Sequence, residues 1–169
     1  GNVGFKVENF NHENMAILEE QWPEIKRGLR LAVRLIASFG FNGRNLRAAS
    51  AVLPIAYYLR QLDPGDGYLT KAAYAEDRQR IRMWLTKSIL KASGIWGSGL
   101  DTLLTLLRET IKKHGQSSFP VDEIETQMAR RGKSLTFEAE EVEELAELQY
   151  GDGRTFALLS LLFPFIDFH

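Results

Sequence analysis

The 169-residue sequence has no cysteine, which excludes disulfide bonds, thiolate metal sites and cysteine nucleophiles. No charged segment followed by an apolar one opens the chain, so a secretory signal peptide is not expected. The most apolar run, residues 157–166, is interrupted by Ser160 and Pro164 and is shorter than the ~20 residues that a membrane-spanning helix needs. These absences predict a cytoplasmic protein without a membrane partner.

Residues suited to catalysis are also sparse. His12, His114 and His169 lie far apart, and none has a histidine or carboxylate partner at the spacing of a helical metal site. The glycine-rich stretch 40–44 matches neither a P-loop nor a dinucleotide-binding motif. The glutamates of residues 138–147 are expected to form a solvated helix face. We therefore expect no catalytic, cofactor-binding or metal-binding residue in this chain.

The two signs of charge are unevenly distributed. Up to Lys91 there are 14 Lys and Arg against 9 Asp and Glu, and after it 7 against 13. This segregation is compatible with a basic surface for an anionic partner, and equally with two halves of one chain that face each other. A third interpretation is that the charges belong to ordinary solvated helix faces.

Apolar residues recur mainly at helical spacing, and strand-like alternation is limited to Val3, Phe5 and Val7. A turn or two is expected over residues 13–21, and a helix is expected to begin at Pro23, where a missing N–H is tolerated. Further helices are expected over residues 51–62, 71–92, 100–113, a short stretch after Pro120, 136–148 and 155–163. The pattern predicts an all-α, irregular bundle of six to eight helices, with at most a short extended segment at the N-terminus.

The length suits one domain with a substantial core. Residues 1–12 are interpreted as an extended lead-in or the remnant of a cleaved tag. Residues 13–169 are interpreted as a single helical domain, a fragment of a larger protein.

Basic side chains and one tryptophan are the candidates for nucleic-acid contact. Binding to phosphates requires positive side chains that share a face, although no groove-reading motif accompanies them. Trp96 lies in a glycine-rich loop, where an aromatic ring can be exposed, whereas Trp84, Tyr57 and Tyr58 are expected in the core. The candidate contact residues are Arg44, Arg47, Arg78, Arg82, Lys87, Lys91 and Trp96.

The chain contains three segments with distinctive sequences. They are FGFNGRNLRAASAVLPIAYYL (residues 39–59), MWLTKSILKASGIWGSG (83–99) and LQYGDGRTFALLSLLFPFIDF (148–168). In this order they resemble segments of the GmrSD-type restriction endonucleases, which are modification-dependent (type IV) enzymes related to phage-defence proteins. The resemblance covers most of the chain from about residue 24 onward.

The resemblance implies a parent protein with an N-terminal nucleotide-handling domain and a C-terminal HNH-type nuclease domain. Such a parent would use a nucleoside triphosphate and a divalent metal. The family's Asp-Gly-Gln-Gln-Arg and His-x-Asp-His motifs are both missing from this sequence, and His169 is expected to be a spacer before the second motif. What the resemblance implies is therefore a non-catalytic helical region that ends just before the nuclease domain, packs between the flanking domains and contacts DNA.

A different class of function remains open alongside this one. The alternative interpretation is a free-standing helical module for protein interaction or oligomerisation. A natural stop codon after His169 and no salt-dependent DNA binding would be expected in that case.

Overall fold

The computed structural model describes residues 11–163, apart from the side chains of residues 92 and 93, and every regular element in that part is helical. The α-helices are α1 (His12–Ser38), α2 (Val52–Leu62), α3 (Ala75–Leu90), α4 (Ala92–Ile95), α5 (Leu100–His114), α6 (Val121–Arg130), α7 (Ala139–Ala146) and α8 (Thr155–Leu162). Short 3₁₀ helices, η2 (Ala49–Ala51), η3 (Asp66–Leu69) and η4 (Ala72–Tyr74), flank α2 and α3. The predicted all-α bundle is confirmed. The strand-like residues 3–7 and His169 lie outside the described residues.

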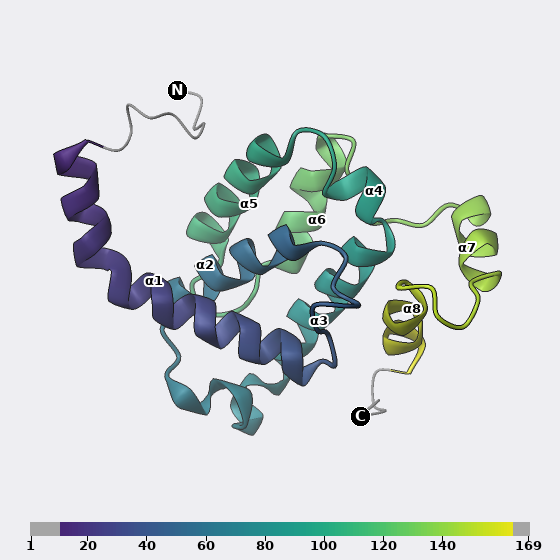
Figure 1. Ribbon diagram of the computed structural model, residues 1–169, viewed down its shortest axis with the longest axis horizontal. Coiled ribbons are helices and arrows are strands. Elements are labelled where there is room, and N and C mark those ends of the chain that lie inside the picture. The colour runs from purple at the N-terminus through teal and green to yellow at the C-terminus, as the bar shows by residue number, and fades with distance from the viewer. Residues whose placement is uncertain (1–10, 164–169) are drawn as a thin grey trace.

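The helices pack around a core formed mainly by α2, α3, α5 and α6. Helix α2 packs against α1 on one side and α5 on another, α5 packs against α6, and α3 packs against α8 (Figure 1). The rings of Tyr58 and Trp84 both contact Phe119, with centroids 5.3 and 5.4 Å apart respectively. All three side chains are fully buried, as expected from the sequence for Tyr58 and Trp84. In the described part of the chain, no helix combines the length and apolarity needed to cross a bilayer.

The first helix is longer than the sequence predicts. Asn11 caps α1 by accepting a hydrogen bond from the backbone N–H of Asn14 at 2.8 Å, and the helix then continues through Pro23. The expected helix start at Pro23 is therefore wrong. A proline removes one helical hydrogen bond, and here the affected turn is exposed, so water can satisfy the freed carbonyl. The ribbon of α1 changes direction along its length, and an internal proline is a usual cause of such a bend (Figure 1).

A buried carboxylate joins four parts of the fold. Asp77 Oδ2 accepts hydrogen bonds from the hydroxyls of Tyr58 and Tyr68, both at 2.7 Å. Its Oδ1 accepts one from the backbone N–H of Phe119 at 2.6 Å. Burial, reinforced by the hydrogen bonds to Asp77, raises the pKa of both tyrosines well above the ordinary value. Asp77 therefore fixes α2, η3 and the segment before α6 against α3.

Candidate functional site

The structure does not bring the predicted basic residues of α3 together on one free face. Arg78 and Arg82 are one turn apart, but Lys87 follows Arg82 by five residues, a step that carries it to the other side of a helix. The guanidinium of Arg78 donates to the backbone carbonyls of Tyr68 at 2.6 Å and Lys71 at 3.0 Å. Arg82 is half-buried on the same side of α3.

The two lysines of this set bind acidic residues from the second half of the chain. Lys87 Nζ lies 3.0 Å from Glu125 of α6, and Lys91 Nζ lies 3.0 Å from Glu141 of α7. Lys91 also donates to the backbone carbonyl of Thr136 at 2.5 Å. The backbone N–H of Glu138, followed by Lys91, holds the pKa of Glu141 below its usual value.

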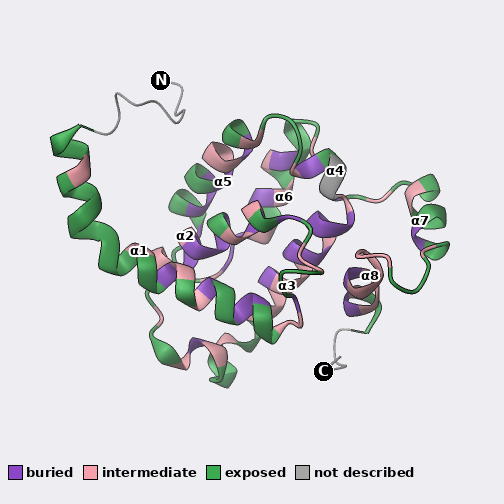
Figure 2. Cartoon of the chain, viewed as in Figure 1, coloured by how far each residue is buried: buried purple, intermediate pink, exposed green. Residues whose placement is uncertain are grey.

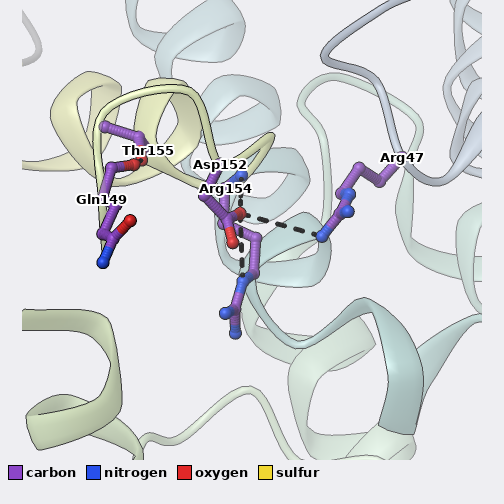
Figure 3. A network of polar contacts seen from close by, with 5 residues as sticks. All are labelled: Arg47, Gln149, Asp152, Arg154 and Thr155. Atoms are coloured by element: carbon purple, nitrogen blue, oxygen red, sulfur yellow. Dashed lines mark hydrogen bonds and ion pairs between the residues drawn. The ribbon is translucent and has the colours of Figure 1, made fainter. Parts of the chain in front are cut away.

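The predicted loop residues Arg44 and Arg47 are both exposed, and Arg47 reaches the turn before α8 (Figure 3). Its Nη1 lies 3.8 Å from Asp152 Oδ1, which also accepts the backbone N–H of Arg154 at 2.8 Å. That N–H, followed by the side chains of Arg154 and Arg47, holds the pKa of Asp152 below its ordinary range.

These contacts explain part of the charge segregation in the sequence. Among the described residues, three ion pairs join a basic residue of the first half to an acidic residue of the second: Arg47–Asp152, Lys87–Glu125 and Lys91–Glu141. The structure thus favours the interpretation in which two halves of the chain face each other. Arg47, Lys87 and Lys91 therefore already have ion-pair partners within the chain when no nucleic acid is bound.

Trp96 lies against the core as well as in a loop. Its ring meets that of Trp84 edge to face, with centroids 5.9 Å apart, and its side chain is half-buried. The loop is fixed by Lys133, whose Nζ donates to the backbone carbonyls of Gly94, Ile95 and Ser98 at 2.8–3.1 Å. A tryptophan held in this way contributes to the packing of the core.

A cleft that the candidate residues do not touch lies beside the second half of α1. It has a volume of about 910 Å³ and runs between α1 and the turn that follows α2. Five basic residues line it, with two acidic ones: Lys26, Arg27, Arg30, Arg34, Arg60, Asp63 and Asp66. Leu29, Leu31, Val33 and Leu59 supply apolar walls.

The local sequence explains how α1 and α2 frame this cleft. Gly28 permits a close approach, because a Cβ at that position would lie 2.8 Å from the carbonyl oxygen of Ala56 and 2.9 Å from Cβ of Arg60. Helix α2 ends at Asp63, whose left-handed backbone (φ 43°) turns the chain back toward α1. There Asp63 Oδ1 lies 3.3 Å from Arg27 Nε.

The charges of the cleft are only partly neutralised. Arg27 pairs with Asp63, and Arg60 binds Glu24 at 3.4 Å. Within residues 11–163, the side chains of Lys26, Arg30 and Arg34 form no hydrogen bond or ion pair. These three recur at four-residue steps, so they form one row along α1.

This basic row was not among the sequence-predicted contacts, although its signal was present. Cations at successive four-residue steps repel each other, which disfavours a helix by a few tenths of a kcal/mol per pair, roughly 0.2–0.5. A helix that retains them without neutralising partners is therefore a candidate anion-binding surface. The periodicity separates these residues from the apolar face of the helix, but it cannot show which cations are left unpaired.

The residues that line the cleft are suited to binding anions. Among the described residues, no group of three His, Asp or Glu side chains lies close enough to hold a metal ion. The free ammonium and guanidinium groups can neutralise phosphates or carboxylates. Neither the protein-family models nor the curated proteins include a match to this chain.

Proposed function

We propose that this chain is a non-catalytic helical region of a GmrSD-like, DNA-targeting restriction or phage-defence nuclease, and that it contacts the DNA backbone through the cleft beside α1. The observation that carries the DNA contact is the row of unpaired cations Lys26, Arg30 and Arg34. Four-residue steps of an α-helix advance about 6 Å, so the row spans roughly 12 Å. Successive phosphates rise ~3.4 Å per strand, and the row can therefore neutralise several of them.

The arrangement of the three family-like segments supports treating them as one unit. The first and third segments meet through Phe41 and Phe156, whose rings lie edge to face with centroids 5.1 Å apart. The same two segments meet again through Arg47 and Asp152. Helix α3, whose C-terminal part belongs to the second segment, packs against α8 of the third. Segments that are far apart in sequence thus form a contiguous part of the fold, as expected if they derive from one ancestral domain.

In this proposal the chain positions its neighbours and takes no part in chemistry. The nucleoside triphosphate and the divalent metal belong to the flanking domains of the parent protein. The helical region packs between them and holds DNA without reading its bases, because the row binds phosphates alone.

Equilibrium binding to a fluorescein-labelled DNA duplex, followed by anisotropy at low salt, tests the DNA contact. The double substitution Arg30→Ala/Arg34→Ala should weaken binding by about tenfold or more, since two phosphates are no longer neutralised. Lys112→Ala/Lys113→Ala removes the same charge from exposed positions at the end of α5 and serves as the matched control. Equal affinity in all three proteins would reject this surface.

The alternative, a helical interaction or oligomerisation module, is favoured by a separate observation. The first half of α1 carries large apolar side chains that remain exposed within the part of the chain that the structure describes.

A further inference from the structure

The first half of α1 extends away from the bundle and is almost entirely exposed (Figures 1 and 2). Over residues 11–24 only Met15 is half-buried, and all other side chains are exposed. Ile17, Leu18 and Trp22 show 48%, 44% and 50% of their surface. A helical segment of this length is marginal in water when nothing packs on it, and clustered apolar side chains on a surface mark an interaction site.

The exposed apolar side chains continue a stripe that runs into the second half of the helix. Leu18, Trp22, Ile25 and Leu29 follow one another at steps of four, three and four residues, which is the spacing of a coiled-coil seam. Ile25 and Leu29 are half-buried, so the stripe remains accessible along its length. The pattern is also symmetric. Reversing the helix about the point between Pro23 and Glu24 exchanges Leu18 with Leu29 and Trp22 with Ile25.

The charges of α1 change sign close to that point, between Glu24 and Lys26. Its first half carries Glu13, Glu19, Glu20 and Glu24, and its second half carries Lys26, Arg27, Arg30 and Arg34. The helix is therefore complementary in charge to a reversed copy of itself. In the antiparallel arrangement, Glu19 of one copy lies opposite the position midway between Lys26 and Arg30 of the other. These three residues lie on the same edge of the seam, so their charges can pair. A parallel pair would instead place like charges side by side, which is unfavourable.

We propose that two copies of this chain associate through their α1 helices, which pack antiparallel along Leu18, Trp22, Ile25 and Leu29. The interface is isologous, since the same surface of each copy contacts the other. This self-association goes beyond the proposed DNA contact and does not depend on it. The charge pattern favours a second copy as the partner. A reversed copy of α1 places opposite charges side by side, whereas an unrelated helix would match this pattern only by coincidence. Lys26 and Arg30 serve both surfaces, so DNA and the second copy compete for them.

Disulfide trapping tests the geometry directly, because the chain has no cysteine of its own. Leu18→Cys and Leu29→Cys are prepared as separate proteins. Mixed under oxidising conditions, they should form a cross-linked heterodimer in high yield, while neither variant alone should cross-link to itself. Efficient self-cross-linking of Leu18→Cys would show a parallel arrangement, and no enrichment of the mixed product would show that α1 does not self-associate. Either result would overturn the proposal.

Sedimentation velocity tests the apolar and charged parts of the interface separately. Trp22→Ala should shift the dimer to monomer, whereas Leu53→Ala, which truncates an equally exposed apolar residue on α2, should not. Glu19→Lys and the double substitution Lys26→Glu/Arg30→Glu should each weaken the dimer. Combining all three changes should restore it, because the charges are exchanged. A wild-type chain that stays monomeric at every concentration reached, or a combination that restores nothing, contradicts the proposal.

The two proposals fail in distinguishable ways. Trp22→Ala removes no cation, so it should abolish the dimer and leave DNA binding unchanged or stronger. Arg34→Ala lies outside the seam, so it should weaken DNA binding and leave the dimer intact. A substitution that affected both equally would point to loss of the fold, and circular dichroism of the same samples detects that.

Discussion

Lys91 and Glu141 form an ion pair at 3.0 Å across a sequence separation of 50 residues, and this pair holds α7 against the end of α3. Leu145 is the one buried residue of the described helix α7, so apolar packing contributes little to its position. The Lys91 ammonium also lies 5.3 Å from the centre of the Phe137 ring. One lysine thus makes an ionic contact with α7 itself, and hydrogen-bonding and cation–π contacts with the segment that leads into it.

Lys91→Met should loosen α7, because methionine keeps most of the apolar stem and removes the charge. We expect a loss of about 1–2 kcal/mol in the free energy of unfolding, the usual contribution of a hydrogen bond to a charged group that is partly shielded. Urea denaturation measures the loss of stability. Faster proteolytic cleavage within residues 131–138 would show that the loosened region is the segment before α7. Lys112→Met, at an exposed position on α5, is the control. Stability equal to wild type would mean that α7 is held by something else.

Asp77→Ala should be among the most damaging single substitutions in the chain. It leaves the hydroxyls of Tyr58 and Tyr68 and the backbone N–H of Phe119 without their acceptor in a buried region. Each unsatisfied buried donor costs about 1–3 kcal/mol, so a loss of at least ~3 kcal/mol is expected. Asp77→Asn retains one acceptor oxygen and should cost less. Chemical denaturation of the two variants measures their losses of stability. A larger loss in Asp77→Asn than in Asp77→Ala would show that the three hydrogen bonds to Asp77 do not govern stability here.

Stability should fall as the solution becomes strongly alkaline. The pKa values of Tyr58 and Tyr68 are raised in the folded state by burial and by Asp77, so the folded chain keeps both protons when the unfolded chain loses them. The stabilisation is complete below pH 10, the ordinary tyrosine pKa, and by pH 11 roughly 1 kcal/mol per tyrosine is lost. Urea midpoints between pH 8 and 11 measure this slope. Tyr68→Phe should reduce it, whereas Tyr150→Phe, which removes a fully exposed hydroxyl, should not. Equal slopes in the two variants would contradict the assignment.

Two glycine-to-alanine substitutions should have opposite effects. At Gly28 the added Cβ would lie 2.8 Å from the carbonyl oxygen of Ala56, so α1 and α2 must move apart. We expect a loss of about 1–3 kcal/mol despite the better helix propensity of alanine. At Gly94 in α4 the added Cβ meets nothing within 4 Å, and the change should be neutral or stabilising by up to about 1 kcal/mol. Thermal unfolding distinguishes them. A neutral Gly28→Ala would mean that α1 and α2 pack together more loosely than this geometry requires.

The number and class of the elements were predictable from apolar periodicity, because most helices here bury one face. The bounds of α5 and α8 agree closely with the sequence pattern. The start of α1 was not predictable from the same signal. Proline is tolerated inside an exposed helix as well as at its first turn, and local sequence does not reveal which surroundings apply.

The candidate site was less predictable than the fold. Sequence identifies cations, but pairing is decided by residues that are distant in the chain, as for Lys87 with Glu125. We expected Arg82 and Lys87 on one polar side of a helix, but their five-residue spacing places them on different faces. Trp96 lies in a glycine-rich loop as expected, yet its ring packs on Trp84 because the loop folds back on the core. The four-residue repeat of Lys26, Arg30 and Arg34 is visible in the sequence, but only the structure shows that these side chains have no partner among the described residues.

The salt dependence of DNA binding tests the central proposal most directly. For wild-type protein, the logarithm of the association constant should fall linearly with the logarithm of salt concentration, because binding to phosphates releases counterions. Arg30→Ala/Arg34→Ala should reduce the magnitude of that slope by about two, close to one for each arginine removed. Lys112→Ala/Lys113→Ala should leave it unchanged. Binding that does not depend on salt, or the same slope in wild type and the Arg30/Arg34 variant, would contradict a DNA contact at the cleft beside α1.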